Sequence, residues 1–306
     1  MSNYGSLQPY IPWRAKPLPL DWSAEFGREA PLKVELGFGN GDYLMRCAKD
    51  DPEANYIGVE MTWGSVWRAL RTARSREVEN VRLLLEDARV GLLWNFSERS
   101  VESFVGLFPC PWPKKRHAKN RLYTPEFLRL CNSRLVDGGA LVVVTDAVAY
   151  RDQMLEEITL ENTGMSTTLE VIPASFNTKY ERKWQAGGQQ EFYRFTFDKI
   201  HHQTIPNPEI HPMKHHRAAS FDPSDFSPVS EKEPFHVSFK SFLFDPQQEV
   251  AMQEVVTIEG GIEQHFWIRI SKSQEKWRIA PAAGSNLLPL PSVQRALDLV
   301  LSAAGG

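Results

Sequence analysis

The sequence predicts a doubly wound α/β domain with a mostly parallel sheet, followed by a second, smaller α+β domain. Between residues 33 and 147, short apolar runs alternate with amphipathic stretches, which is the pattern of strand–helix units. The strand runs are apolar throughout, as in strands buried on both faces of a parallel sheet. After about residue 230, apolar and polar residues alternate at period two instead. We therefore expect domains at 1–200 and 230–306, joined by a linker at 201–229.

The composition limits the class of protein. The chain has 306 residues, 42% of them hydrophobic, and a net charge of −3, so any nucleic-acid contact has to come from a local basic patch. Its three cysteines show no CxxC spacing, which favours a reducing compartment over a zinc or disulfide framework. The proline-rich N-terminus does not have the pattern of a signal peptide, and no apolar run is long enough to span a bilayer. We expect a cytoplasmic protein with no membrane partner.

The expected elements of the first domain follow in order. Five apolar runs predict strands, at 32–39, 55–60, 80–87, 100–109 and 140–146. Three stretches with helical spacing predict helices, at 41–51, 64–77 and 124–139. The last of these is well marked, because Thr124 suits the N-cap, Pro125 the first helical position, and Gly138 the C-terminal end.

The segment from 201 to 229 is rich in proline, serine and histidine, which is typical of a linker. Its five histidines, at 201, 202, 211, 215 and 216, could in principle bind a metal, but their spacing fits no standard ligand pattern, so we expect none. In the second domain, residues 236–244, 249–258 and 264–271 predict strands, with a Gly260-Gly261 hairpin between the last two. Residues 292–304 predict an amphipathic helix.

A glycine-rich loop, "VELGFGNG", closes the first predicted strand with Gly37, Gly39 and Gly41. Glycines at such a place let the chain turn sharply and let a ligand approach the backbone. The spacing is G-x-G-x-G, which differs from the dinucleotide pattern G-x-G-x-x-G. The loop alone therefore does not define the ligand.

Acidic residues at the strand ends narrow the choice. Glu60 ends the second strand, where a carboxylate can accept both ribose hydroxyls, and Asp87 ends the third, where it can accept an adenine amino group. Glu35 adds a third acid next to the loop. Three acids repel a phosphate and attract a cation. S-adenosylmethionine fits this pattern, since it carries an adenosine, a sulfonium and an ammonium; the alternative is that the acids only end strands in solvated loops.

The fourth strand leads into "FPCPWPKKRHAKNRL", a proline turn followed by five cations: Lys114, Lys115, Arg116, Lys119 and Arg121. Ligands of doubly wound sheets bind outside the carboxyl ends of the strands, so this segment would flank the methyl donor. Its cations could neutralise phosphates, and Trp112 offers a face for base stacking. We expect this segment to contact RNA, the alternative being a solvated charged face.

These motifs resemble a known family, the bacterial tRNA (guanine-N7-)-methyltransferases. The resemblance covers roughly residues 30–198. It rests on "ELGFGNGDYL", "NYIGVE", "NVRLLLEDA", "FPCPWPKKRHAKNRL", "TPEFL", "VVTDAVAY" and "NTKYERKW". It implies a Rossmann-like methyltransferase sheet, S-adenosylmethionine as the methyl donor, no metal, and tRNA as the partner.

The resemblance also implies site residues. The glycines and the acids Glu35, Glu60 and Asp87 would bind the donor. The residues that the resemblance assigns to the substrate are Lys114, Asp146, Thr178, Lys179, Tyr180 and Glu181, and the charge of the basic turn adds Arg116.

One position departs from the family pattern. The family usually has P-D-P-W-P-K, with the aspartate assigned to the donor and the catalytic centre, and here that position is Cys110. Guanine N7 already has an exposed lone pair, so catalysis requires alignment more than a base. An aspartate would nevertheless accept hydrogen bonds from N1–H and N2–H and stabilise the cationic methylated ring. Cys110 and Asp146 are the expected catalytic positions, because Asp146 can supply the missing acceptor.

Three functions therefore stay open. The first is methylation of guanine N7 in tRNA. The second is a related methyltransferase acting on another RNA or a small substrate, and the third is a non-catalytic module that binds tRNA or the donor. Residues 231–306 contain two more acids than Lys and Arg, so we expect no independent RNA site there. The one segment that could contact RNA is "KWRIAPAAG", in which Lys276 and Arg278 flank Trp277. Trp267 and Trp277 are expected in its core, and a protein partner or self-association through this domain stays open.

Overall fold

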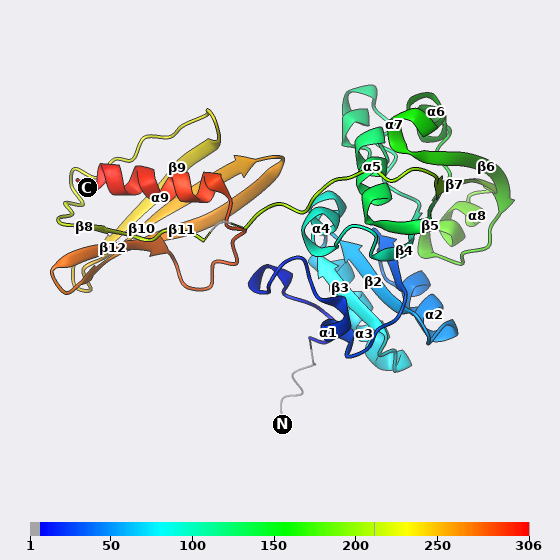
Figure 1. The fold of residues 1–306 in the computed structure, drawn as a ribbon, viewed down its shortest axis with the longest axis horizontal. Helices are drawn as coiled ribbons and strands as arrows, with labels where there is room; N and C mark the ends of the chain where they lie inside the picture. Colours follow the sequence, from blue (N-terminus) through cyan, green and yellow to red (C-terminus); the bar gives the residue numbers. More distant parts are fainter. Residues whose placement is uncertain (1–6, 211, 306) are drawn as a thin grey trace. The chain divides into compact units, whose positions relative to one another are not determined.

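The computed structural model describes residues 7–210 and 212–305, apart from the side chains of Lys115, Lys179 and Tyr180. These residues form two compact units, divided between Pro208 and Glu209, which are described separately. Figure 1 shows the elements of both in chain order.

The first unit is built on a seven-stranded sheet of order β3-β2-β1-β4-β5-β7-β6. Strands β1 to β5 are parallel, and β7 runs antiparallel to both of its neighbours. The prediction of a doubly wound, mostly parallel sheet is thus confirmed. The strands are β1 (Leu32–Leu36), β2 (Asn55–Glu60), β3 (Val81–Leu85), β4 (Val101–Leu107), β5 (Leu135–Thr145), β6 (Met165–Pro173) and β7 (Glu191–Lys199).

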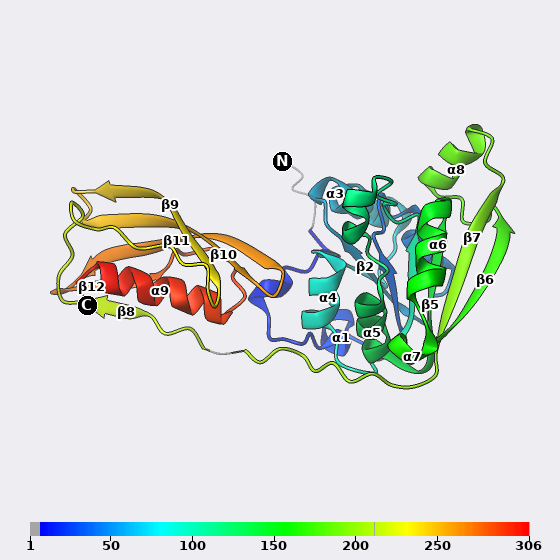
Figure 2. The same ribbon diagram turned by 90° about the horizontal axis from the view of Figure 1, so that it is seen from above.

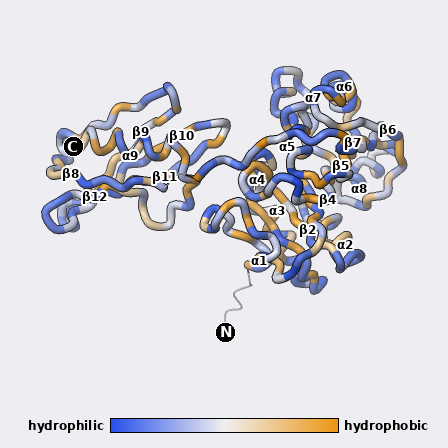
Figure 3. The backbone as a smooth tube through the Cα atoms, viewed as in Figure 1, coloured by the Kyte–Doolittle hydropathy of each residue, from blue (hydrophilic) through white to orange (hydrophobic). Residues whose placement is uncertain are grey.

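Helices cover both faces of this sheet, with α3 on one face and α4, α5 and α7 on the other (Figure 2). Hydrophobic residues gather along the strands in the middle of the unit, where the core lies (Figure 3). The helices are α1 (Trp22–Phe26), α2 (Asp42–Asp50), α3 (Trp63–Arg76), α4 (Ala88–Asn95), α5 (Pro125–Arg134), α6 (Val148–Glu157), α7 (Leu160–Thr163) and α8 (Lys179–Ala186). Two 3-10 helices complete the unit, η1 (Trp13–Ala15) and η2 (Lys115–Asn120).

Helix α5 begins as the sequence predicts but ends earlier. The Thr124 hydroxyl accepts a hydrogen bond from Phe127 N, and Pro125 is the first helical residue. The helix ends at Arg134 instead of Gly138, because the buried Arg134 guanidinium donates to the carbonyl oxygens of Leu92 and Ile205 and fixes the chain there. Gly138 lies inside β5, so the prediction of the helix end was wrong.

The second unit is a five-stranded antiparallel sheet of order β8-β12-β11-β10-β9, with helix α9 packed on one face. Its elements are β8 (His216–Ala218), β9 (His236–Asp245), β10 (Val250–Glu259), β11 (Ile262–Ser273), β12 (Lys276–Pro281) and α9 (Pro291–Ala303). The Gly260-Gly261 hairpin joins β10 to β11, and both glycines have positive φ. An α+β second domain was therefore predicted correctly.

Much of the predicted 201–229 linker is ordered structure. Ile205 N donates to Glu98 Oε1, and Asn207 Nδ2 donates to the carbonyl oxygens of Leu93 and Phe96, so residues 203–207 pack on the first unit. Beyond the boundary, β8 pairs with β12, and Phe221 is buried in the second unit. The structure accordingly places the unit boundary at Pro208, inside the expected linker.

Candidate functional site

The strand order reverses between β1 and β4, since β2 and β3 extend the sheet on one side and β5 on the other. In open α/β sheets, ligands bind at this switch point, outside the carboxyl ends of the strands. The glycine loop follows β1 and the Cys110 loop follows β4, and β1 pairs directly with β4. The fold thus brings the predicted donor loop and the predicted basic turn to the same edge of the sheet.

The glycine loop requires its glycines. Gly37, Gly39 and Gly41 all have positive φ, between 59° and 79°, a region that other residues rarely adopt. A Cβ on Gly41 would also lie 3.0 Å from the Ala69 Cβ of α3. The loop closes against β2, because Gly37 N donates to Val59 O over 2.8 Å.

Glu60 lies at the end of β2 with its carboxylate fixed beside this loop. Its Oε2 accepts from Gly39 N over 3.1 Å, and its Oε1 accepts from Thr62 N over 3.1 Å. Oε1 also accepts from Thr62 Oγ1 over 3.2 Å. A carboxylate has about four lone-pair sites, so Oε2 can still accept from a ligand. The structure therefore brings together the loop and the acid that the sequence analysis paired.

Asp87 caps helix α4, its Oδ1 accepting from Arg89 N over 2.7 Å. Its Oδ2 lies 3.3 Å from Arg89 Nη1. This acid is held at the end of β3, where the sequence pattern places it, but part of its accepting capacity already serves the helix and Arg89.

Exposed apolar side chains lie beside these acids, and they were not among the residues predicted from the sequence. Met61 and Trp63 directly follow Glu60 and are 67% and 45% exposed. Tyr10 packs edge-on against Trp63, with ring centroids 5.4 Å apart. Exposed large apolar groups beside a fixed carboxylate suit the flat face of an aromatic ligand. Their position directly after the strand-ending acid is the signal that could have identified them.

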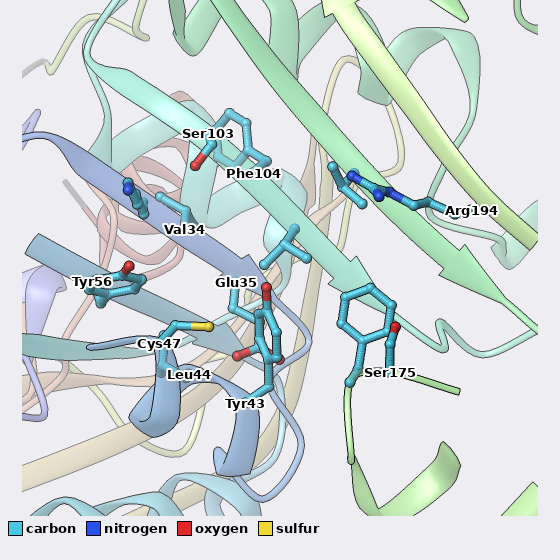
Figure 4. A pocket seen from close by; sticks show the side chains of 14 residues that line it. Val34, Glu35, Tyr43, Leu44, Cys47, Tyr56, Ser103, Phe104, Ser175 and Arg194 are labelled. Carbon is cyan, nitrogen blue, oxygen red and sulfur yellow. The ribbon is translucent and has the colours of Figure 1, made fainter. Parts of the chain in front are cut away.

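Glu35 has a different environment from the other two acids. Its side chain is only 4% exposed, and Oε2 has no hydrogen-bond partner among the described residues. The carboxyl lines a cavity of about 480 Å³ together with Tyr43, Cys47 and Arg194 (Figure 4). Gly37, Gly39, Gly41, Glu60 and Asp87 do not line this cavity. Glu35 thus lies below the loop, on the sheet face that carries α2, two residues deeper than Glu60 but within reach of its charge.

Burial raises the pKa of Glu35 to about 8, against a backbone hydrogen bond from Leu44 and the charge of Arg46, which lower it. The native state therefore holds a proton that the unfolded chain releases near pH 4.5. Stability falls as the pH rises from about 4.5 to 8, by at most about 1.4 kcal/mol per pH unit for this one group.

Glu35→Gln is expected to remove that loss, because the amide stays neutral. Urea unfolding without donor at pH 5, 7 and 9 measures the free energy of unfolding of both proteins. The difference between the variant and the wild type should increase in favour of the variant as the pH rises, with most of the increase below pH 8. Parallel stability curves for the two proteins would contradict a protonated Glu35.

The Cys110 loop shows backbone strain on both sides of the cysteine. Phe108 and Trp112 have positive φ, 54° and 44°, although neither is glycine. Such residues cost about 1–3 kcal/mol each and cluster at functional sites. Phe108 N donates to Val144 O over 2.7 Å, which ties the loop to β5. The Cys110 thiol is free and exposed at the centre of this loop.

Three of the five cations that follow Cys110 are exposed. Lys114, Arg116 and Lys119 are exposed, and no acid pairs with them among the described residues. The side chain of Lys115 lies outside the described residues. Trp112 is partly buried and packs edge-on against His117, with ring centroids 5.9 Å apart.

Arg121 does not belong to the RNA-facing group, contrary to the sequence prediction. It is only 6% exposed, and its Nε donates to Pro111 O over 2.8 Å. Its Nη1 donates to Ala149 O over 3.0 Å and to the Gln153 side chain. The guanidinium lies 5.1 Å from the centre of the Tyr150 ring. Arg121 thus connects the Cys110 loop to the segment after β5.

Asp146 follows β5 at the start of that segment and is partly exposed. Burial raises the pKa of its carboxyl above the usual range. No other residue among those described donates a hydrogen bond to its side chain. The structure therefore leaves Asp146 able to accept from a ligand near the Cys110 loop.

The late motif begins helix α8, and two of its residues bond within their own turn. The Thr178 hydroxyl accepts from Glu181 N over 3.1 Å, which makes it the helix N-cap. Glu181, 1% exposed, accepts from Ser175 N and Phe176 N over 2.7 and 3.0 Å. These bonds fix the loop before α8. The side chains of Lys179 and Tyr180, also predicted to bind substrate, lie outside the described residues.

The histidine-rich segment shows pairing with acids. His216 Nε2 lies 2.7 Å from Asp298 Oδ1, and His202 Nε2 lies 3.5 Å from Glu98 Oε2. His211 lies outside the described residues. Within the described ranges, no three or more His, Cys, Asp or Glu side chains are grouped as metal ligands would be. In the same part of the chain, no helix has the length and apolar character needed to cross a membrane.

Comparison with known proteins agrees with this geometry. A family model described as "Putative methyltransferase" matches residues 29–194. A tRNA (guanine-N(7)-)-methyltransferase of Thermotoga maritima is 31% identical over 291 residues, covering 91% of each chain. The enzyme of the same name from Aquifex aeolicus is 28% identical and covers 88% of this chain and 92% of its own.

Among solved structures, the 16S rRNA (adenine(1408)-N(1))-methyltransferase of Catenulisporales acidiphilia matches with a TM-score of 0.45 and 15% identity, over 61% of this chain and 97% of its own. The Thermotoga and Aquifex matches are long enough to extend into the second unit, beyond the family model. The chain belongs to the tRNA (guanine-N7-)-methyltransferase family.

Proposed function

We propose that this protein transfers the methyl group of S-adenosylmethionine to N7 of a guanosine in tRNA, in the cytoplasm and without a metal. The observation that carries the proposal is the meeting of two loops at the switch point. The glycine loop with Glu60 and Asp87 suits an adenosine that has no phosphate, and the basic turn with Asp146 suits an RNA guanine.

The donor side rests on the fixed carboxylates. Glu60, held by Gly39 N and Thr62 N, would accept from the ribose hydroxyls, and Asp87 would accept from the adenine amino group. Met61 and Trp63 would cover the adenine ring. Glu35 supports the start of α2 through Leu44 N and acts on the donor through the loop geometry.

The acceptor side requires alignment instead of proton removal. The N7 lone pair attacks the methyl carbon as the carbon–sulfur bond breaks, the electron pair goes to sulfur, and the positive charge passes to the guanine ring. Asp146 would accept from the base and stabilise that charge. Thr178 and Glu181 act as positioning residues, since their hydrogen bonds hold the loop before α8.

The test is a methylation assay on an unmodified tRNA transcript, followed by nucleoside mass spectrometry. We expect 7-methylguanosine as the product. The donor alone should also stabilise the protein, by about 2.7 kcal/mol at a hundred times its dissociation constant. A melting temperature that does not change at saturating donor would contradict methyl transfer to tRNA and to any other substrate.

One observation, the exposed Cys110 at the family's aspartate position, favours two alternative functions. A related methyltransferase acting on another RNA or a small molecule would bind the donor and leave tRNA unmodified. A non-catalytic module would bind tRNA without transferring a methyl group.

Lys114→Ala and Arg116→Ala are expected to weaken tRNA binding and flatten its salt dependence. Both side chains are exposed, and neither forms an ion pair with an acid in the part of the chain that the structure describes, so each can neutralise one phosphate. The slope of log K against log salt should fall by about 0.7–0.9 for each phosphate that is no longer neutralised. Filter binding across a salt titration measures it, with the exposed Lys49→Ala on α2 as control. Equal slopes in all variants would show that the RNA surface lies elsewhere.

A further inference from the structure

The sheet of the second unit has one covered and one open face. Helix α9 packs on one face, where Ile268, Ile270 and Ile279 are buried (Figures 1 and 2). Phe221 packs on the same face, against Trp277, with ring centroids 5.1 Å apart. Because side chains alternate along a strand, the residues between these point to the opposite face. None of the described helices covers that face.

Three arginines lie on neighbouring strands of this open face. Arg217 on the edge strand β8 is directly opposite Arg278 on β12. Arg278 is opposite Ser271 on β11, and Arg269 lies two residues from Ser271 along the same strand. All three are exposed, while their chain neighbours Ala218, Ile279 and Ile268 are buried. We call these three residues the arginine cluster.

The cluster lacks acidic partners. None of its members forms an ion pair with an acid among the described residues, and Arg278 Nη2 lies instead 3.2 Å from His215 Nδ1. Like charges directly opposite on neighbouring strands are destabilising. Arg217 and Arg278 are opposite each other on an open sheet face, and no acid neutralises them among the described residues. A bound anion would therefore stabilise this arrangement. Lys276 on β12, also exposed, adds a fourth cation at the same edge.

An aromatic side chain extends the cluster. Trp267 lies two residues before Arg269 on β11 and hence on the same face, and it is partly exposed. Arginine forks match phosphate oxygens, and an aromatic face stacks on an unpaired base. An acidic peptide would pair with the cations but would leave the Trp267 indole without a stacking partner. The combination fits a polynucleotide strand with accessible bases.

We propose that the arginine cluster and Trp267 form a second tRNA-binding surface, contributed by residues 209–306. The proposal rests on the proposed function for its choice of RNA. It replaces the expectation of no RNA site in this domain, which relied on net charge. The net charge does not describe this distribution, because Arg217, Arg278, Lys276 and Arg269 lie together on β8, β12 and β11. The acids of the same face lie beside them: Glu254 on β10 is opposite Trp267, and Glu263 is further along β11.

The test compares tRNA binding by the full chain, without donor, across a salt titration. Arg217→Ala with Arg278→Ala is expected to lower the slope of log K against log salt by about 1.4–1.8. Lys232→Ala with Lys240→Ala removes two exposed cations of the same unit outside the cluster and should leave the slope unchanged. Trp267→Ala should weaken binding roughly 5- to 150-fold with the slope preserved.

The controls separate folding from binding. Removing one of two opposed arginines should not lower the melting temperature, and Arg278→Lys should keep the salt slope. Equal slopes for the arginine and lysine pairs, with tRNA methylation intact, would overturn the surface and leave the proposed function standing. An arginine-dependent slope in a protein that makes no 7-methylguanosine would support the surface and contradict the proposed function. Failure of the wild type to bind tRNA would overturn both.

Discussion

Replacing Cys110 with aspartate is expected to raise the rate of guanine N7 methylation by about 10²- to 10³-fold, the usual effect of one preorganised group on developing charge. The thiol lies exposed in the loop after β4, between two residues with strained backbone, so an aspartate fits there without displacing a neighbour. Its carboxylate would accept from guanine N1–H and N2–H. It would also stabilise the positive charge that appears on the ring as the methyl group arrives.

The gain should depend on charge and not on shape. Cys110→Asn has nearly the same size as the aspartate variant but no charge, so we expect at most a small increase in rate. Cys110→Ala should behave like the wild type if the thiol takes no part. The measurement is single-turnover methylation of a tRNA transcript at saturating donor, which isolates the chemical step from binding.

The result also decides between functions. A faster Cys110→Asp enzyme acting on the same tRNA would show that Asp146 and the basic turn already place guanine correctly. If only the variant methylates tRNA, the natural substrate of the wild type lies elsewhere. A variant no faster than wild type would show that Cys110 does not face the reacting base.

The elements that bear the donor loop could be predicted because local patterns determine them. The run "NYIGVE" is apolar on both faces and became β2 with the same limits. Gly37, Gly39 and Gly41 follow a strand at a spacing that only a sharp turn explains, and all three have positive φ. Glu60 and the loop meet because parallel strands end at the same edge of the sheet.

What could not be predicted depends on long-range packing. The resemblance predicts that Glu181 binds the substrate, but nothing in the sequence indicates that this acid is buried and accepts from the backbone N–H groups of Ser175 and Phe176. Glu35 differs from Glu60 in that it lies further from the carboxyl end of its strand and is buried. The pattern of a single sequence does not indicate how deeply a strand residue is buried. The arginine cluster arises from strand pairing between residues far apart in the chain, Arg217 and Arg278. Net charge conceals it.

Arg121 is another residue whose role depends on long-range packing, and its replacement is expected to lower the catalytic rate strongly. Arg121→Met should lower kcat at least about 10²-fold, because it releases the Cys110 loop from the segment after β5, and a misplacement of about 1 Å can cost that much. The guanidinium joins Pro111 O, next to Cys110, to Ala149 O, in the segment that follows Asp146. Both sides of the proposed guanine site are therefore held by one side chain.

Stability should fall as well, by about 2–4 kcal/mol, because two carbonyl oxygens lose a buried charged donor. Methionine keeps most of the apolar stem, so the packing against Tyr150 is largely retained and the variant should still fold. Arg121→Lys should recover little activity, since one ammonium cannot reach Pro111, Ala149 and Gln153 as a planar fork does.

Kinetics can separate positioning from RNA binding and from stability. At a temperature well below both melting points, Arg121→Met should lose kcat while its tRNA affinity and salt slope stay near wild type, since the buried guanidinium touches no phosphate. Arg116→Ala, on the same segment and exposed, should show the reverse, with weaker binding and a largely intact rate at saturating tRNA. An Arg121→Met enzyme with normal kcat would mean that the loop keeps its shape without this arginine. If the substitution raised only KM and left kcat unchanged, Arg121 would bind RNA together with the exposed cations, as the sequence predicted.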